Sequence, residues 1–329
     1  MKTKIIDLTI EKNADEKIIE AADVLKRGGL VAFPTETVYG IGADAFNEDA
    51  VKRVYEAKGR PSDNPMIVHI ARASDAGLLA DRFSKEFVKL ADAFWPGPLT
   101  MVLPKKAEVP DCVTGGLDTV GIRLPDSRIA QLLIRFAGTP VAAPSANLSG
   151  RPSPTKAEHV IEDLDGKVDV ILIGPECRVG IESTVIDMTT SPPCILRPGV
   201  VTAEEIEAVL ETPIEHGGDS ETPRSPGTKY KHYAPEAQML VVEGAREKVK
   251  NEIVRIKTLN ENLGLKVGVL LFEERDYLAA AHDFYAALRE LDEDGADLIL
   301  AGALSETDGV GFAVMNRMLK AAGYNIARI

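Results

Sequence analysis

Cysteine is scarce in this sequence and shows no pairing. Three occur among 329 residues, Cys112, Cys177 and Cys194. Disulfide frameworks and structural zinc sites both need paired cysteines, so this spacing argues against either. The five histidines show no metal-ligand spacing. We therefore expect no metal site built from side chains of this chain.

Long apolar runs are also missing. No uninterrupted apolar stretch approaches the ~20 residues that a membrane span needs. The first residues, Met1-Lys-Thr-Lys-Ile-Ile-Asp, lead directly into a polar stretch and do not resemble a signal peptide. The sequence therefore predicts a soluble cytoplasmic protein without membrane association.

Positive charge is in the minority. The chain has 38 Lys and Arg against 51 Asp and Glu, a formal net charge of -13. Broad binding to a nucleic-acid backbone depends on clustered Lys and Arg. We therefore expect no stable direct binding of a nucleic acid such as RNA. A small anion remains possible, because a few local cations outweigh a distant net charge once water is excluded.

Familiar nucleotide and nucleophile motifs are absent as well. The chain contains no Gly-x-x-x-x-Gly-Lys-[Ser/Thr] phosphate loop and no Gly-x-Ser-x-Gly elbow. Gly40-Ile-Gly42 lacks the third glycine of a dinucleotide fingerprint. Any nucleotide must be bound by a different set of loops.

Five short polar strings dominate what is present. They are rich in hydroxyl groups and in the turn formers Pro and Gly, which fix loops at strand ends where ligands usually bind. The second and fifth also carry cations. The strings span residues 34–40, 58–65, 144–150, 182–184 and 225–235. Together they predict a hydroxyl-lined, cationic pocket suited to an anionic small molecule such as a nucleotide.

The first two thirds of the chain mix helical and strand patterns, which predicts an α/β domain over residues 1–210. Its strands are irregularly spaced, so we do not expect a regular doubly wound sheet there. Apolar spacing predicts helices over residues 15–27, 48–57, 84–94, 129–136 and 157–164. Short apolar runs predict strands over residues 30–33, 66–70, 99–103, 120–124, 141–143, 170–173 and 185–188.

Apolar residues are few between 211 and 225, so residues 211–238 are expected to form a linker. Strand and helix patterns then alternate, which predicts a small parallel, Rossmann-like domain over residues 239–329. The expected strands are 239–242, 267–272 and 298–301. The expected helices are 247–256, 279–291 and 311–322.

Several polar residues invite a functional interpretation beside an ordinary one. Lys58, Arg60 and Asn64 lie between a helix end and a strand start. Cations there stabilise the helix dipole without any function, whereas a phosphate site would explain all three. Arg123, inside an apolar strand, needs a partner. That partner is either an internal carboxylate or the carboxylate of a ligand, which a guanidinium binds through two hydrogen bonds.

His69 and residues 229–233 can also be interpreted either as ordinary structural residues or as parts of a functional site. His69 ends an apolar strand, where a histidine is more often a satisfied core residue than a ligand contact. Residues 229–233 form the densest aromatic and basic cluster of the chain. They fit a solvated linker, a weak nucleic-acid contact, or a strap that closes over a pocket of the first domain. We favour the strap, because Pro226 and Pro235 would limit its conformations.

Motifs in the first domain resemble the YrdC-like family of threonylcarbamoyl-AMP synthases. The matching strings are Pro34-Thr-Glu-Thr-Val-Tyr-Gly40, Lys58-Gly-Arg-Pro-Ser-Asp-Asn-Pro65, Val120-Gly-Ile-Arg-Leu-Pro125, Ala143-Pro-Ser-Ala-Asn147, Glu182-Ser-Thr-Val185 and Leu196-Arg-Pro-Gly199. Ser225-Pro-Gly-Thr-Lys-Tyr-Lys-His-Tyr-Ala-Pro235 resembles the linker of the family's long, two-domain form. The resemblance is strong in the first domain and linker and weaker in the last 90 residues.

This resemblance implies an activity and a set of site residues. The family joins L-threonine, bicarbonate or CO₂, and ATP to give threonylcarbamoyl-adenylate and pyrophosphate. A separate tRNA threonylcarbamoyl transferase then modifies the adenosine beside the anticodon. Residues implied to hold threonine are Thr35, His69, Arg123, Ala143 and Ser183. Residues implied to contact ATP are Lys58, Ser62, Asn64, Thr119, Ser145, Asn147, Ser153 and Arg197, with Arg60 nearby and Tyr230, His232 and Tyr233 covering it.

The implied chemistry asks for no side-chain nucleophile. A carbamate of threonine attacks the α-phosphorus of ATP, so the needs are alignment, exclusion of water and neutralisation of phosphate charge. Lys58 and Arg60, together with Mg²⁺, are implied to supply that charge. The resemblance also implies a twisted, mostly mixed sheet with a concave pocket. Two alternatives remain, a related carbamoyltransferase and an RNA-binding translation or ribosome-assembly module.

Overall fold

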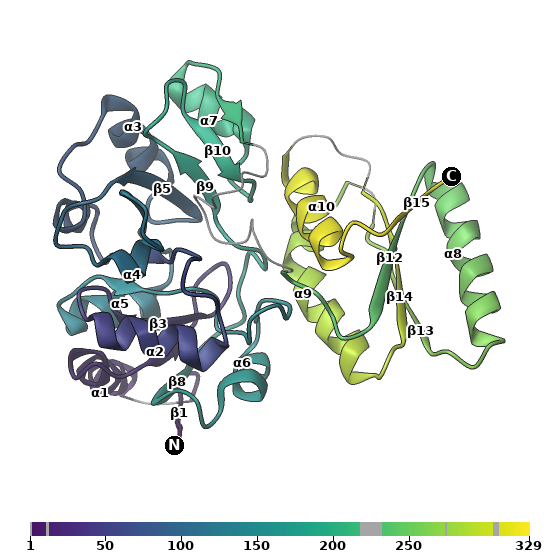
Figure 1. Cartoon of the computed structure of the whole chain (residues 1–329), viewed down its shortest axis with the longest axis horizontal. Helices are drawn as coiled ribbons and strands as arrows, with labels where there is room; N and C mark the ends of the chain where they lie inside the picture. The colour runs from purple at the N-terminus through teal and green to yellow at the C-terminus, as the bar shows by residue number, and fades with distance from the viewer. Residues whose placement is uncertain (1, 11–12, 218–231, 274, 305–308) are drawn as a thin grey trace.

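The structure, a computed structural model, describes residues 2–10, 13–217, 232–273, 275–304 and 309–329. Its described strands form two separate sheets, one of eleven strands and one of four, each with helices on its faces (Figure 1). None of the described helices is long and apolar enough to cross a membrane. The expected α/β class with two sheet-containing parts is confirmed.

The larger sheet is mixed, as expected for this family. Its order is β1-β8-β2-β3-β7-β4-β6-β5-β9-β10-β11, with parallel pairs such as β4 and β6 beside antiparallel pairs such as β5 and β6. The strands are β1 (Lys4–Asp7), β2 (Val31–Phe33), β3 (Gly40–Asp44), β4 (Ile67–His69), β5 (Leu99–Pro104), β6 (Thr119–Arg123), β7 (Val141–Ala142), β8 (Val170–Ile173), β9 (Thr184–Asp187), β10 (Cys194–Arg197) and β11 (Glu215–His216).

Helices cover this sheet and supply its core. Helices α1 and α5 pack together over β2 and β8, with Leu25, Phe33 and Leu133 fully buried between them. Burying such side chains stabilises the fold by about 1.5–3 kcal/mol each. The helices are α1 (Ala14–Lys26), α2 (Glu48–Lys58), α3 (Lys85–Phe94), α4 (Asp111–Thr114), α5 (Arg128–Ala137), α6 (Ala157–Leu164) and α7 (Ala203–Leu210), with a 3₁₀ helix over Ala73–Leu78.

Some elements were not expected from the sequence. Strand β3 contains Gly40 and Gly42, which depress the strand signal. A side chain at Gly42 would meet Val141 and the Phe33 ring at 2.6 and 2.8 Å, so only glycine lets β3 pass there. Strand β11 lies inside the predicted linker. It pairs with β10 through exposed residues that carry no apolar pattern, so the first sheet extends past residue 210.

The second sheet is small and parallel, which confirms the Rossmann-like expectation. Its order is β13-β14-β12-β15, and every pair is parallel. Helix α8 lies on one face, while α9 and α10 lie on the face toward the first sheet (Figure 1). The elements are β12 (Gln238–Glu243), α8 (Arg246–Glu261), β13 (Val267–Leu270), α9 (Tyr277–Glu293), β14 (Leu298–Gly302), α10 (Gly309–Ala321) and β15 (Ile326–Arg328).

The two parts share a buried apolar cluster. Val38 and Ile181 of the first part pack in one cluster with Phe284 and Tyr285 of α9. Tyr233 joins them where the chain enters the second part, and its ring lies 5.4 Å from that of Tyr285. This cluster places α9 directly behind the loops that carry the polar strings.

Candidate functional site

One cleft in the first part collects residues from most of the polar strings. Its open volume is about 590 Å³. The lining comes from the ends of β2, β4, β6 and β7, from two loops and from the segment that enters the second part. The lining residues are Thr35, Thr37, Val38, Tyr39, Gly40, Arg60, Ile67, His69, Arg123, Ala143, Pro144, Ser145, Glu182, Ser183, Arg197, His232 and Tyr233.

All five residues expected to hold threonine line this cleft: Thr35, His69, Arg123, Ala143 and Ser183. They come from positions far apart in the sequence. Strand pairing explains the convergence, because β4 lies between β6 and β7 and pairs His69 with both Arg123 and Val141. The Ser183 hydroxyl bonds that of Thr100 at 2.8 Å, which holds it at the cleft wall.

Arg123 has an internal carboxylate partner and also faces the cleft, so the ligand role remains a prediction. Its guanidinium is buried and lies 2.7 Å from the Glu36 carboxylate, an internal ion pair. It also donates to the Thr37 hydroxyl at 2.9 Å and to the Gly97 carbonyl at 3.3 Å. The same side chain faces the cleft. Glu36, not assigned a role from the sequence, sets its orientation.

His69 is held neutral by its surroundings. Burial, reinforced by the positive charge of Arg123, lowers the pKa of His69 to about 3. Its Nδ1 is buried and has no hydrogen-bond partner in the described residues. A neutral imidazole beside a guanidinium leaves the net positive charge at this end of the cleft to Arg123.

Buried neutral histidines make the stability of the protein sensitive to acid. The pKa of His69 falls from 6.5 to about 3 and that of His159, where burial is again the main cause, to about 4. Below pH 6.5 the unfolded chain therefore binds more protons than the folded one, and stability falls as the pH falls. At pH 5 we expect a loss of about 2 kcal/mol for each histidine.

Urea unfolding at several pH values measures this effect. Replacing His69 or His159 by Gln is expected to reduce the slope of unfolding free energy against pH between 6.5 and 5 by about 1 kcal/mol per pH unit. His159 lies outside the cleft lining, so it separates a burial effect from one tied to the site. A wild-type protein equally stable at pH 7 and pH 5 would contradict the prediction.

The residues expected at the nucleotide are divided by the structure. Arg60, Ser145, Arg197, His232 and Tyr233 line the cleft. Asn147 and Ser153 lie just behind it, bonded to Ser145 and Glu182. Thr119 lines a separate small cavity, Ser62 is exposed and Asn64 is buried. Tyr230 lies outside the described residues, as does most of the predicted strap.

Two guanidinium groups, of the partly buried Arg60 and the buried Arg197, give the cleft positive charge. Burial lowers the pKa of Arg60 to about 10, and the group donates to the Pro65 carbonyl at 3.0 Å. Arg197 donates to the Ser183 carbonyl at 2.9 Å and to the Ser183 hydroxyl at 3.2 Å. Arg197 thus connects the nucleotide residues with the threonine residues.

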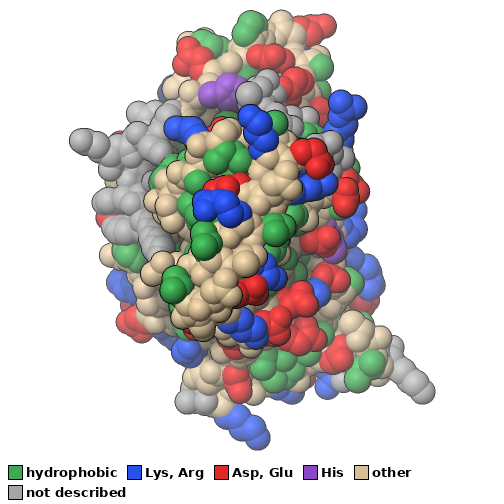
Figure 2. All heavy atoms as spheres, turned by 90° about the vertical axis from the view of Figure 1, so that its right-hand side faces the viewer, with side chains coloured by type: hydrophobic (Ala, Val, Ile, Leu, Met, Phe, Trp, Pro, Cys, Tyr) green, Lys and Arg blue, Asp and Glu red, His purple; other side chains and the backbone are tan. Residues whose placement is uncertain are grey.

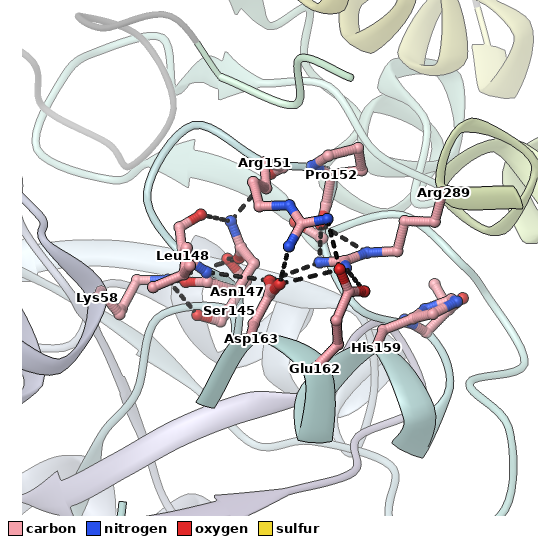
Figure 3. A network of polar contacts seen from close by, with 12 residues as sticks. Lys58, Ser145, Asn147, Leu148, Arg151, Pro152, His159, Glu162, Asp163 and Arg289 are labelled. Carbon is pink, nitrogen blue, oxygen red and sulfur yellow. Dashed lines mark hydrogen bonds and ion pairs between the residues drawn. The ribbon is translucent and has the colours of Figure 1, made fainter. Parts of the chain in front are cut away.

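Lys58 does not line the cleft. It ends α2, and its buried ammonium donates to the carbonyl oxygens of Ser145 and Asn147 (Figure 3). Burial, followed by the charge of Arg60, lowers its pKa well below the ordinary value. In this arrangement Lys58 ties down the loop of residues 145–151 from below.

Glu182 is a site residue that the sequence left without a role. It lines the cleft and accepts hydrogen bonds from Ser153 at 2.6 Å, from Tyr285 at 2.9 Å and from Arg317 at 3.2 Å. Burial raises its pKa, but Arg317, Arg197 and the Ser153 hydroxyl outweigh this and the net shift is downward. The sequence does contain one sign that Glu182 has a distant partner. Arg289 and Arg317 interrupt the apolar faces of helices α9 and α10, and a buried arginine needs a carboxylate or carbonyl partner.

Family models match nearly the whole chain. The Sua5, YciO and YrdC model, described as "Telomere recombination", matches residues 23–199. The model described as "Threonylcarbamoyl-AMP synthase, C-terminal domain" matches residues 201–323. Both parts of the chain therefore have known counterparts.

Full-length relatives show the same match. Threonylcarbamoyl-AMP synthases from Pyrococcus abyssi and Bacillus subtilis are 49% and 46% identical to the chain. The alignments cover 98% and 100% of this chain and 100% of each relative. The crystal structure of P. abyssi Sua5 complexed with L-threonine superposes with a TM-score of 0.93 at 47% identity, covering 100% of both chains.

Proposed function

Because the chain belongs to the Sua5/YrdC family of threonylcarbamoyl-AMP synthases, we propose that the cleft described above is where its reaction takes place. The reaction joins L-threonine, bicarbonate or CO₂, and ATP. It yields threonylcarbamoyl-adenylate and pyrophosphate. The observation that carries the assignment is the convergence of Thr35, His69, Arg123, Ala143 and Ser183 on one cleft.

Threonine is proposed to bind at the end of the cleft that holds Arg123. The buried guanidinium suits the amino-acid carboxylate, and Glu36 keeps it in place. Thr35 and Ser183, which both carry hydroxyl groups, line the same cleft. The Ala143 side chain is small enough to leave room for a substrate methyl group. The crystal structure of P. abyssi Sua5 complexed with L-threonine supports threonine as the ligand, whereas its position beside Arg123 is our proposal.

The nucleotide is proposed to bind at the end of the cleft that holds Arg60 and Ser145. Arg60 and Arg197 supply positive charge for the phosphates, and Ser145 and Asn147 supply hydrogen bonds. We propose that Ser62, Asn64, Thr119 and Ser153 act from the surrounding shell. Lys58 fixes the loop of residues 145–151 through its hydrogen bonds to the Ser145 and Asn147 carbonyls. Together with Arg60, it is proposed to stabilise the negative charge that develops on the phosphate in the transition state.

The chain needs only to align its substrates and exclude water. The threonine amine adds to CO₂ and loses a proton, which gives a carbamate. A carbamate oxygen attacks the α-phosphorus, the bond to the β-phosphate oxygen breaks, and pyrophosphate leaves. Arg123 orients the threonine and Arg60 faces the phosphates, so the reacting atoms are held together rather than activated by a nucleophile.

The described residues do not form a site for Mg²⁺. No group of three or more His, Cys, Asp and Glu side chains among them is arranged to hold a metal ion. Glu36 and Glu182, the carboxylates nearest the proposed substrates, are paired with arginines. We propose that Mg²⁺ arrives bound to the phosphates of ATP, and we assign no step to it.

His232 and Tyr233 are proposed to cover the bound nucleotide. Both line the cleft, and their rings lie 5.6 Å apart. The following residue is anchored, since the Ala234 amide donates to the Gly150 carbonyl at 2.8 Å. A cover of this kind protects an easily hydrolysed adenylate from water. Tyr230 is proposed to contribute from outside the described residues.

The wider context is proposed from the reaction. We propose that a tRNA threonylcarbamoyl transferase consumes its labile product and that the chain acts in the cytoplasm. We propose residues 1–210 as the YrdC-like catalytic domain, 211–238 as the linker and 239–329 as the second domain. The start of the second sheet at β12 supports the last boundary, and β11 shows where the linker touches the first sheet.

Pyrophosphate release tests the proposed function. We expect release that requires ATP, bicarbonate and threonine together, and a mass spectrum of the product that matches threonylcarbamoyl-adenylate. Serine is expected to be a poorer substrate, because one methyl group in a closed pocket is worth about 1–3 kcal/mol. Pyrophosphate release independent of the amino acid would contradict the proposal.

The alternative of an RNA-binding module makes a different prediction. Figure 2 shows the face of the second domain that carries α8, where Lys and Arg side chains are interspersed with Asp and Glu. That face offers no broad cationic surface for a phosphate backbone. Salt-dependent RNA binding without pyrophosphate release would favour the alternative.

A further inference from the structure

Helix α9 contacts the first domain through two buried polar side chains on one of its faces. Tyr285 and Arg289 lie one helical turn apart and therefore share a face. Tyr285 donates to Glu182 at the cleft, as described above. Arg289 is 1% exposed, although arginine is almost never fully buried unless it is paired. Its partners explain its position.

All the partners of Arg289 belong to the first domain. Its guanidinium donates to the Asp163 carboxylate at 2.7 Å, to the Pro152 carbonyl at 2.7 Å and to Glu162 at 3.2 Å. Asp163 is completely buried, whereas Glu162 is partly exposed. A buried carboxylate without cations is strongly unfavourable, and Arg289 is one of the two arginines, with Arg151, that offset the charge of Asp163.

Asp163 in turn holds the loop of residues 145–151. Its carboxylate accepts a hydrogen bond from the Leu148 backbone amide at 3.1 Å and forms an ion pair with Arg151 at 2.6 Å. Within the loop, the side-chain amide of Asn147 donates to the carbonyl oxygens of Leu148 and Arg151 at 2.8 and 2.9 Å. Figure 3 shows the chain of contacts, with Arg289 reaching it from one side and Lys58 from the other.

We propose that Arg289 is a positioning residue for ATP, through which the second domain completes the nucleotide end of the cleft. The loop presents Ser145 to the cleft and is fixed from below by Lys58 and from behind by the pair of Asp163 and Arg289. This inference rests on the proposed placement of ATP beside Ser145. It assigns the second domain a role in the reaction itself.

The expected effect is selective for one substrate. The proposed threonine residues make none of these contacts, and Ala143, two residues before Ser145, is held separately by its amide, which donates to the Ile67 carbonyl at 2.9 Å. Loosening the loop is therefore expected to displace the ATP site more than the threonine site. A displacement of about 1 Å costs up to roughly 100-fold in rate. For Arg289→Ala we expect the KM for ATP to rise on the order of 10- to 100-fold, with the KM for threonine changed less than about threefold.

Two further measurements separate positioning from simple loss of structure. Millimolar guanidinium, which fits the space vacated in Arg289→Ala, is expected to lower the KM for ATP toward the wild-type value. Arg289→Lys keeps the charge but not the fork of donors, so its KM for ATP is expected to be intermediate. The matched control is Arg255→Ala, an exposed arginine of the same domain paired with Glu252 on its own helix.

Arg289→Ala leaves Asp163 with one cation fewer, so a second variant guards against failure to fold. Asp163→Asn with Arg289→Met removes both charges at once and avoids a lone buried carboxylate. This double variant is expected to fold and to keep a high KM for ATP that guanidinium does not lower.

The possible failures are distinguishable. A wild-type chain that releases no pyrophosphate with threonine and ATP overturns the proposed function. An active wild-type chain with an unchanged KM for ATP in the Arg289 variants overturns this inference alone. Equal losses for threonine and ATP without rescue by guanidinium also overturn it, because they indicate a general structural role.

Discussion

Threonine use is expected to collapse when the charge of Arg123 is removed together with that of its partner. In a Glu36→Gln, Arg123→Gln double variant the KM for threonine is expected to rise on the order of 1000-fold, because truncating one partner of a buried charge pair costs several kcal/mol. The KM for ATP is expected to change little, since Arg60 and Arg197 remain. Amino-acid-dependent pyrophosphate release measures both constants.

The charges of Glu36 and Arg123 are removed together so that loss of threonine binding is not confused with loss of folding. Arg123→Gln alone would leave the Glu36 carboxylate buried without a cation and destabilise the fold by about 3–5 kcal/mol. The control is Glu36→Gln alone, which keeps the guanidinium in the cleft and is expected to bind threonine far better than the double variant. If the double variant binds threonine normally, Arg123 serves only as an internal ion pair and the threonine assignment is wrong.

Turnover is expected to fall on the order of 100-fold in Lys58→Met, because the loop that presents Ser145 to the proposed nucleotide loses the ammonium that fixes it, and a displacement of about 1 Å costs up to roughly 100-fold in rate. The structure adds a second expectation that the sequence alone did not suggest. Methionine fills the volume but leaves the carbonyls of Ser145 and Asn147 without their donor, which costs about 1–3 kcal/mol of stability. Single-turnover kinetics and urea unfolding measure the two effects.

The matched control is Lys52→Met on the same helix. Lys52 is exposed and pairs only weakly with Glu48 and Asp49, so neither turnover nor stability is expected to change by more than about 0.5 kcal/mol. Combining Lys58→Met with Arg289→Lys separates two modes of action. Additive losses indicate that Lys58 acts on the phosphates directly, whereas sub-additive losses indicate that both residues act through the loop. Unchanged turnover in Lys58→Met would remove Lys58 from the catalytic group.

The residues proposed to hold threonine were implied by the family resemblance alone, but strand geometry explains why they converge on one cleft. His69 and Arg123 each end an apolar run, and strand ends meet at one edge of a sheet. Turn chemistry marked Ser145 in the same way, directly after β7. Strand β3 was not predicted because its glycines give no strand signal. Glycine is needed at position 42 because Phe33 and Val141, which lie elsewhere in the sequence, leave no room there for a side chain.

Contacts between distant segments could not be predicted. Nothing in the sequence near Lys58 shows that its ammonium is bonded to carbonyl oxygens more than 80 positions away, since a lysine that ends a helix is usually solvated. Glu36 lies inside a quoted motif, but only the fold brings Arg123 to it. Arg289 and Arg317 interrupt apolar helix faces, which predicts a partner but does not identify it.

The pairing of first-domain carboxylates with second-domain arginines also sets an order of events during synthesis. Asp163 lies 126 residues before Arg289, and Glu182 lies 135 residues before Arg317. Domains fold as they leave the ribosome, the N-terminal one first. The nascent first domain therefore holds two acidic groups, Asp163 and Glu182, that each still lack one of their arginine partners. Its cleft matures only after α9 and α10 are made, so an incomplete chain carries every proposed substrate contact of the first domain without the supports that align them.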